Sequence, residues 1–314
     1  MINSVRIVTA LTYTEGRFPP MSGFLDTLNT IIWSPALVFL CLGAGIYFTL
    51  ATKFLQIRCI PDMIKQLKDG ESSESGVSSF QSLMISLAGR VGVGNISGVA
   101  TAIAFGGPGA VFWMWAVALL GSATSFVECT LAQVYKEKDQ DTGEYRGGPA
   151  YYIEKAYKHT KAGPFMVVYG IVFAIAMILA TSYFLPGIQA NGVAAAVENA
   201  WGIKVGWSAI VLAGVLALII IGGVKRIANF ASLVVPFMAG AYILFAIIIL
   251  FVNFSQIPEV FGMIFKSAFG AEQAFSGLLG SAIMWGVKRG IYSNEAGQGL
   301  SLIHISEPTR PLYI

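Results

Sequence analysis

Charged residues are scarce in this sequence, and cysteine and histidine are nearly absent. Only 12% of the 314 residues are charged, whereas 55% are hydrophobic and the mean hydropathy is +0.69. Soluble domains carry more charge, so this composition excludes one and indicates an integral membrane protein. The net charge of +3 is small and the basic residues lie in loops between apolar runs, so no nucleic-acid partner is expected.

Other absences exclude particular chemistries. Cys41, Cys59 and Cys129 form neither an even set nor a CxxC pair, so neither a disulfide framework nor a metal site is expected. The sequence has no GxxxxGK[ST] motif, which disfavours an ATP-driven pump. The two histidines, His159 and His304, lie outside the apolar runs, and no carboxylate cluster occurs within a run. A membrane-embedded enzyme is therefore not expected, and neither is an organic cofactor.

Long apolar runs predict membrane-spanning helices, because a hydrocarbon core of about 30 Å needs roughly 20 apolar residues of helix. The runs lie at 31–52, 78–105, 111–134, 164–198, 206–223 and 230–252, with a seventh that begins near residue 276. The run at 164–198 is longer than a bilayer requires, so it is expected to tilt, to kink at Pro186 or to project beyond the lipid. Tyrosines and lysines in residues 147–163 predict a further helix at the headgroup level.

Lysine and arginine are concentrated in the loops that follow the first, third and fifth runs. Loops rich in these residues stay on the cytoplasmic side of a membrane. The N-terminus is therefore expected outside, and the protein is expected in the cell membrane as a multi-pass protein.

The second run contains an interruption. Its segment GRVGVGNISG, residues 89–98, holds four glycines in ten positions. Backbone groups freed by a break are costly in lipid, so a break persists where it lines a cavity. There the N–H groups of a half-helix favour a carboxylate, and the freed carbonyl groups favour a cation. The alternative is an unbroken, glycine-rich helix that packs closely against a neighbour.

A similar pattern recurs near the end of the chain. Arg90, Asn95 and Gly98 have the same spacing as the matching residues of RGIYSNEAG, at 289–297. The first segment lies in the first of five spans, and the second segment follows the last of them. Because five is an odd number, the second segment enters the membrane from the opposite side. The sequence therefore predicts an all-α, polytopic membrane protein with discontinuous helices in an inverted five-helix repeat, of which the chain holds only the start of the second copy. The residues expected at the second break are Gly290, Ser293 and Asn294.

Four segments resemble one transporter family. They are FQSLMISLAGRVGVGNISGVATAIAFGGPGAVFWMW, GGPAYYIEKA, QANGVAAAV and WGVKRGIYSNEAGQG. Together they look like the alanine or glycine:cation symporter family over nearly all of residues 21–299. The resemblance implies the leucine-transporter (LeuT) type of fold with an extra helix before the repeat. It also implies sodium-coupled import of small neutral amino acids by alternating access.

The resemblance further implies which residues bind substrate and sodium. The substrate carboxylate is expected at the N–H groups of Val93 and Gly94, and Trp285 is expected to wall the pocket. The family usually has threonine where this sequence has Val93, which leaves the substrate preference open. Gln189 at the membrane interface and Trp285 as an ordinary core aromatic remain alternatives. The expected substrate residues are Gly92, Val93, Gly94, Asn95, Gln189 and Trp285, and the expected sodium residues are Ala88, Val91 and Asn95.

Three charged residues are expected inside the membrane or beside the second break. Arg90 lies in the second run, Glu128 lies in the third, and Glu295 follows the second break. A charge at mid-bilayer costs roughly 2.5 to 3.5 kcal/mol on insertion scales, so these residues are expected to pair. We expect Arg90 to pair with Glu128 or Glu295 and to help close an inner gate. A static structural ion pair is the alternative.

The chain is thus expected to have three parts. Residues 1–20 form an N-terminal extension of doubtful origin, residues 21–299 form the membrane transporter domain, and residues 300–314 form a non-native tail. The expected partners are a small neutral amino acid, a sodium ion and the lipid bilayer, and a monomer is expected. An inactive fragment of such a carrier, a proton-coupled carrier, and a channel or sensor with the same fold remain alternatives.

Overall fold

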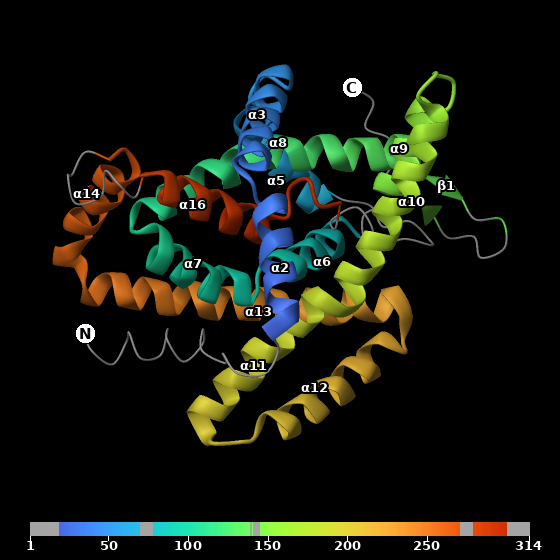
Figure 1. Cartoon of the computed structure of the whole chain (residues 1–314). Helices are drawn as coiled ribbons and strands as arrows, with labels where there is room; N and C mark the ends of the chain where they lie inside the picture. The colour runs from blue at the N-terminus through green and yellow to red at the C-terminus, as the bar shows by residue number, and fades with distance from the viewer. Residues whose placement is uncertain (1–18, 70–77, 139, 141–144, 271–278, 300–314) are drawn as a thin grey trace. The chain divides into compact units, whose positions relative to one another are not determined.

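The computed structural model describes residues 19–69, 78–138, 140, 145–270 and 279–299 (Figure 1). The predicted tail at 300–314, most of the extension at 1–20 and the predicted start of the seventh span near residue 276 lie outside these residues. The chain divides into two units, residues 1–41 and 42–314, and each is described by itself. Apart from a two-stranded hairpin, the elements of the described residues are helical, which confirms the predicted fold class.

The first unit contains helix α2 (Pro19–Ile32) and the beginning of α3 (Pro35–Ala51). Proline disfavours a helical conformation in the residue before it, so the chain leaves the helix at Trp33 and Ser34. The carbonyl oxygen of Ser34 then accepts hydrogen bonds from the N–H groups of Leu37 and Val38 at the start of α3. The first predicted span is therefore present, but it begins earlier and is interrupted near its start.

In the second unit, α3 is followed by two short helices, by the broken second span and by a long third helix. Helix α6 begins with a capping box, in which Gln81 N–H donates to Ser78 Oγ at 3.2 Å and Ser78 N–H donates to Gln81 Oε1 at 2.9 Å. Buried side chains of α6, among them Met84 and Ile85, pack against α13 through Ala231 and Val235. These elements are α4 (Leu55–Arg58), α5 (Ile60–Asp69), α6 (Ser79–Arg90), α7 (Val93–Gly106) and α8 (Gly109–Tyr135).

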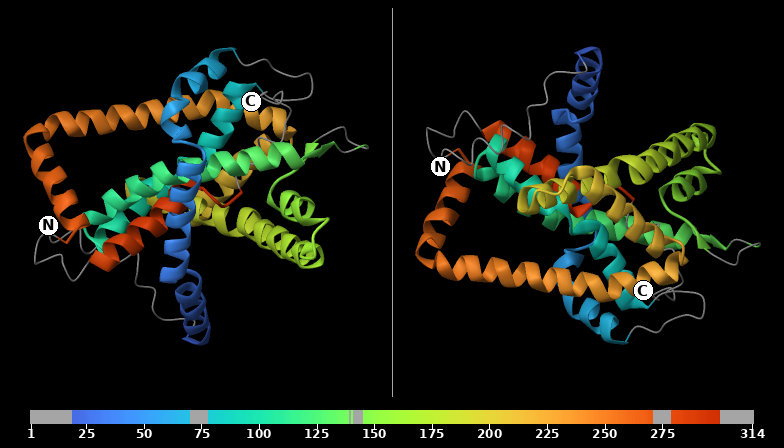
Figure 2. Two further views of the ribbon diagram at one scale, coloured as in Figure 1. Left: turned by 90° about the horizontal axis from the view of Figure 1, so that it is seen from above. Right: turned by 90° about the horizontal axis from the view of Figure 1, so that it is seen from below.

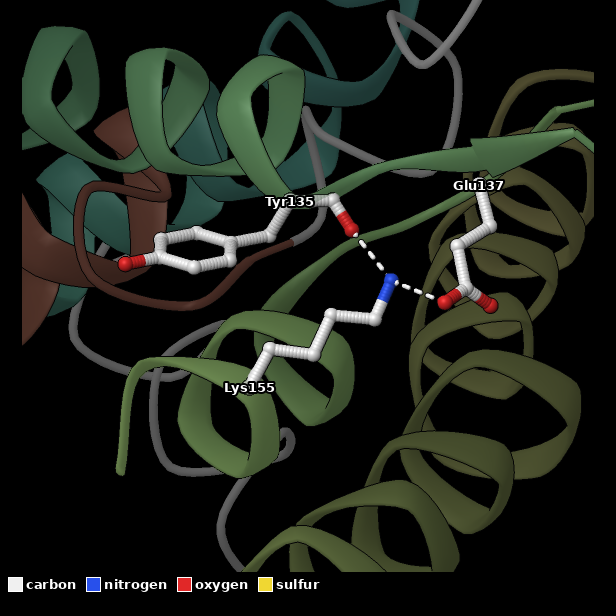
Figure 3. Close-up of polar contacts among 3 residues, drawn as sticks. All are labelled: Tyr135, Glu137 and Lys155. Atoms are coloured by element: carbon white, nitrogen blue, oxygen red, sulfur yellow. Dashed lines mark hydrogen bonds and ion pairs between the residues drawn. The ribbon is translucent and has the colours of Figure 1, made fainter. Parts of the chain in front are cut away.

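A hairpin and a short helix follow α8, and polar contacts of Lys155 hold them at the C-terminal end of α8 (Figure 3). Strands β1 (Glu137–Lys138) and β2 (Tyr145–Arg146) pair antiparallel, and α9 (Pro149–Tyr157) is the helix predicted within residues 147–163. Lys155 Nζ donates to the carbonyl oxygen of Tyr135 at 2.8 Å and lies 2.6 Å from Glu137 Oε1. A cation at the C-terminus of a helix is favourable, so Lys155 both caps α8 and holds the hairpin.

The long run at 164–198 forms two helices joined by a π-helical turn. These are α10 (Gly163–Leu179), η1 (Ala180–Phe184) and α11 (Leu185–Trp201). Pro186 lies directly after the wide turn and has no N–H to donate, so the helical ladder is disturbed before it. The expected irregularity is present, and it lies in the turn that precedes Pro186.

The remaining helices complete the second unit. α13 begins at Gly223, about seven residues before its predicted start, and η2 and α14 were not predicted at all. α14 packs against α8, where Gly109 N–H donates to Ser267 Oγ at 3.0 Å. These elements are α12 (Val205–Ile220), α13 (Gly223–Val252), η2 (Phe254–Gln256), α14 (Ile257–Ala268) and α16 (Leu279–Asn294).

Five helical segments among the described residues are long and apolar enough to cross a membrane. The shorter apolar helix α12 corresponds to the fifth predicted run, and α16 carries the described part of the seventh. Figure 2 shows α8 and α16 running side by side in both views, in agreement with their contacts. The five are Thr27–Ala51, Ser79–Gly106, Gly109–Tyr135, Gly163–Trp201 and Arg226–Val252.

Candidate functional site

The second span is broken where the glycines predict a break. α6 ends at Arg90, Val91 and Gly92 adopt extended conformations, and α7 begins at Val93. The chain thus offers the N-terminus of a half-helix and the C-terminus of another within two residues.

Three hydrogen bonds at this break depart from the helical pattern. Gly92 N–H donates to Asn95 Oδ1 at 3.3 Å, and Asn95 N–H donates to the Gly92 carbonyl at 3.1 Å. Val93 N–H donates to Gln189 Oε1 of α11 at 3.0 Å. In a continuous helix the N–H groups of Gly92 and Val93 would instead reach the carbonyl groups of Ala88 and Gly89. The break therefore turns those carbonyls away from their helical donors.

A cavity of about 330 Å³ lies against this break. It is bounded by the break itself, by the π turn and the start of α11, and by the end of α16. Of the residues predicted to bind substrate or sodium, those that line it are Ala88, Val91, Gly92, Gly94, Asn95 and Gln189. Val93 is not among the lining residues, because its methyl groups face α11, where a Cβ on Gly192 would lie 2.7 Å from Val93 Cγ2.

The prediction that Gly290 opens the second break is wrong. α16 continues through Gly290 to Asn294, and the chain leaves the helix at Glu295, whose φ is 55°. Gly290 faces α8, where an added Cβ would lie 3.1 Å from Val117 Cβ, and a Cβ on Gly286 would lie 2.6 Å from the Ala110 carbonyl oxygen. Two glycines four residues apart thus allow α16 to approach α8 closely, which is the small-residue packing that the sequence left open as an alternative.

The other two residues predicted at the second break have different positions. Ser293 lines the cavity, whereas Asn294 is turned toward α8. Asn294 Nδ2 donates to the Val117 carbonyl at 3.0 Å, and Asn294 Oδ1 accepts from Ala296 N–H at 2.9 Å. Asn294 therefore ends the helix and fixes it to α8.

Trp285 does not belong to the described cavity lining. Its ring stacks on Phe105 of α7 with centroids 5.0 Å apart, and because Phe105 is 46% exposed and Trp285 is only partly buried, the ring neither lines the described cavity nor lies in the core. Tyr292 of the same helix lines the cavity instead, and a Cβ on Gly94 would lie 2.7 Å from its ring. Because α16 continues past Gly290, the aromatic wall lies two turns beyond Trp285. The seven-residue spacing, which places both residues on one helical face, was the signal for Tyr292.

The three charged residues lie near the first break and the end of α16. Glu128 accepts hydrogen bonds from the N–H groups of Gly297 at 2.8 Å and Gly299 at 3.2 Å. Arg90 Nη2 donates to Ser125 Oγ at 2.9 Å, and Glu295 lines the cavity. The Arg90 charge acts on both the Glu128 and the Glu295 carboxylate. Two backbone N–H groups thus hold the Glu128 carboxylate, a contact that the sequence did not predict, and the pairing of Arg90 with Glu128 or Glu295 stays a prediction.

The described residues contain five helical segments long and apolar enough to cross a membrane, one of them broken beside a cavity, and this arrangement is typical of polytopic membrane proteins of the secondary-transporter class. The chain belongs to the sodium:alanine symporter family, whose profile matches residues 20–306. This agrees with the family expected from the sequence motifs.

Three relatives illustrate the similarity. YrbD of Bacillus subtilis is 55% identical over 279 residues, which are 89% of this chain and 56% of that protein. The sodium/proton-dependent alanine carrier protein of Bacillus sp. PS3 is 50% identical over 76% of this chain and 51% of its own length. The sodium/alanine symporter AgcS of Methanococcus maripaludis is 43% identical over 88% of this chain and 60% of its own length. The chain thus spans between half and two thirds of these relatives.

Proposed function

We propose that this protein takes part in sodium-coupled import of small neutral amino acids, such as alanine or glycine, by alternating access. The observation that carries the proposal is the break at Val91 and Gly92, which opens onto a cavity between the two helices of the predicted repeats. The names of two relatives, a sodium/alanine symporter and a sodium/proton-dependent alanine carrier, support the choice of substrate and ion.

The substrate carboxylate binds at the start of α7. The N–H groups of Val93 and Gly94 are the first of a half-helix, where the helix dipole favours a negative charge. Tyr292 covers Gly94 from the opposite side, and this close approach limits the space for a substrate side chain. A small amino acid suits such a site better than a large one.

The sodium ion binds on the other side of the same break. The carbonyl groups of Ala88 and Val91 and the side-chain oxygen of Asn95 are its proposed ligands, and all three residues line the cavity. Oxygen ligands of this kind suit a hard cation, as at other unwound membrane helices. Substrate and ion would share one short segment, so each would favour the conformation that binds the other.

The proposed setting is the cell membrane, with the N-terminus outside and the protein a monomer. This topology leaves Lys155 and the β1–β2 hairpin on the cytoplasmic side, where loops rich in lysine and arginine are expected.

The test is uptake of radiolabelled alanine into proteoliposomes that contain the 314-residue chain. We expect an inward sodium gradient to drive concentrative uptake that saturates and shows counterflow, with unchanged alanine recovered inside. Uptake driven by a proton gradient without sodium would contradict the sodium coupling. A folded, monodisperse protein that neither transports nor binds alanine would contradict the proposal and favour the inactive-fragment alternative.

A further inference from the structure

The best N–H donor of the first break is already occupied. Val93 N–H, which the proposed function assigns to the substrate carboxylate, donates to the side-chain oxygen of Gln189 at 3.0 Å. Gln189 belongs to α11, 96 residues further along the chain. The bond therefore joins two separate transmembrane segments, α7 and α11, at the N-terminus of α7.

The side-chain amide of Gln189 is packed closely against the first break. A Cβ on Gly92 would lie 2.9 Å from Gln189 Oε1 and 3.1 Å from Gln189 Nε2, so a larger residue at position 92 would push the amide out of this position. Gln189 also lines the cavity together with Gly92 and Gly94. The planar amide thus lies between the break and the cavity, in the position that a carboxylate of similar shape would need.

We propose that Gln189 is a built-in substitute for the substrate carboxylate, which holds the Val93 N–H while the site is empty and is displaced when an amino acid binds. This inference rests on the proposed function and adds a specificity-determining role for Gln189 to it. It identifies the α-carboxylate as the group that competes for the Val93 N–H.

The exchange is favourable for physical reasons. An N–H left without an acceptor in a partly buried site has a free-energy cost, and the Gln189 oxygen prevents that in the empty protein. A carboxylate is a stronger acceptor than a neutral amide oxygen, so it displaces the amide. The released Gln189 Nε2 then has two N–H donors to offer to the bound carboxylate. A ligand with an amide in place of the carboxylate lacks this advantage, so alaninamide is expected to bind far more weakly than alanine.

Two substitutions at this position separate the roles of Gln189. Gln189→Glu places a permanent carboxylate on the Val93 N–H and repels the substrate carboxylate, so alanine affinity is expected to fall about 100-fold. Gln189→Met has a similar length but removes the competing oxygen together with the donor, so affinity is expected to change less than about tenfold. Alanine binding to the purified 314-residue chain in nanodiscs, measured by scintillation proximity, gives both values.

Gln298→Glu is the matched control. Gln298 lines the same cavity, but its side chain donates to the Ile291 carbonyl at 3.1 Å and does not contact the first break. This variant adds the same negative charge to the cavity without occupying the Val93 N–H. Where Gln189→Glu is expected to lower alanine affinity about 100-fold, we expect Gln298→Glu to lower it by about tenfold or less.

Hydrogen exchange at the Val93 amide gives a readout that does not depend on transport. Without ligand, exchange is expected to be faster in Gln189→Met than in the unaltered protein, and alanine is expected to restore protection in Gln189→Met. Equal exchange in the two ligand-free proteins would overturn the inference, as would undiminished alanine binding by Gln189→Glu. If the unaltered protein fails to bind alanine while the exchange difference persists, the proposed substrate fails and the Gln189 contact stands.

Discussion

Two segments of this protein look alike in sequence, the first break and the end of α16, which we call the second interruption, but their backbone N–H groups are held by different acceptors. At the first, the N–H of Val93 is held by the neutral side-chain amide of Gln189. At the second, the N–H groups of Gly297 and Gly299 are held by the carboxylate of Glu128. A charged acceptor binds about twice as strongly as a neutral one, so the second interruption is closed firmly and the first is open to exchange. The difference agrees with the proposed ligand binding at the first break and favours structural anchoring at the second.

The strongest test of this comparison is Glu128→Ala. The substitution leaves two backbone N–H groups without their acceptor, so the free energy of unfolding is expected to fall by about 2 to 3 kcal/mol. Differential scanning fluorimetry in detergent measures the loss as a lower midpoint. Glu128→Gln keeps one acceptor oxygen and is expected to lose about half as much. Equal stability of all three proteins would show that the second interruption needs no anchor.

The two aromatic residues of α16 give the next largest effect. Tyr292→Leu removes the ring that covers Gly94, so alanine affinity is expected to fall about tenfold and larger neutral amino acids to compete better. Trp285→Leu removes a ring that stacks on Phe105 away from the described cavity, so selectivity among amino acids is expected to remain. Competition of unlabelled amino acids against labelled alanine measures both. The reverse result would place the pocket wall at Trp285.

The matched asparagines sharpen the comparison further. Asn294→Ala removes the bonds to Val117 and Ala296 and is expected to destabilise the protein by about 1 to 2 kcal/mol. Asn95→Ala removes a longer bond to Gly92 and a proposed sodium ligand, so its main effect is expected on the sodium concentration that gives half-maximal binding. Thermal midpoints recorded across a sodium titration separate the two effects. A sodium dependence that changes with Asn294 and not with Asn95 would reverse the assignment.

The smallest effect is expected away from both interruptions. Lys155→Met removes the cap on α8 and an ion pair whose partner Glu137 is 60% exposed, so a loss of only about 0.5 to 1 kcal/mol is expected. Because the ion pair is screened, the difference in thermal midpoint is expected to shrink in high salt. A loss as large as that of Glu128→Ala would mean that the hairpin, and not the second interruption, dominates the stability of this end of the bundle.

The first break was predictable because four glycines within ten residues of one apolar run favour few other structures. The second was misplaced because glycine within a transmembrane helix serves two purposes, to break it or to bring a neighbour close. Gly290 serves the second purpose, and only the position of Val117 on α8 decides this. For the same reason, the sequence did not point to Tyr292, which lines the described cavity where Trp285 does not. The hydrogen bonds of the Glu128 carboxylate to two backbone N–H groups were not predicted, because charge alone does not show which N–H groups lie near a carboxylate.

The amino-acid sequence by itself determined the fold class, the approximate bounds of most of the apolar helices in the described residues, the family and the site of the first break. These follow from hydropathy and from local backbone preference, which act over a few turns of chain. The tertiary structure alone decided that Gln189 closes one interruption and Glu128 the other, because each bond joins residues at least 96 positions apart. Contacts of that kind depend on how the helices pack, and no local pattern of residues specifies them.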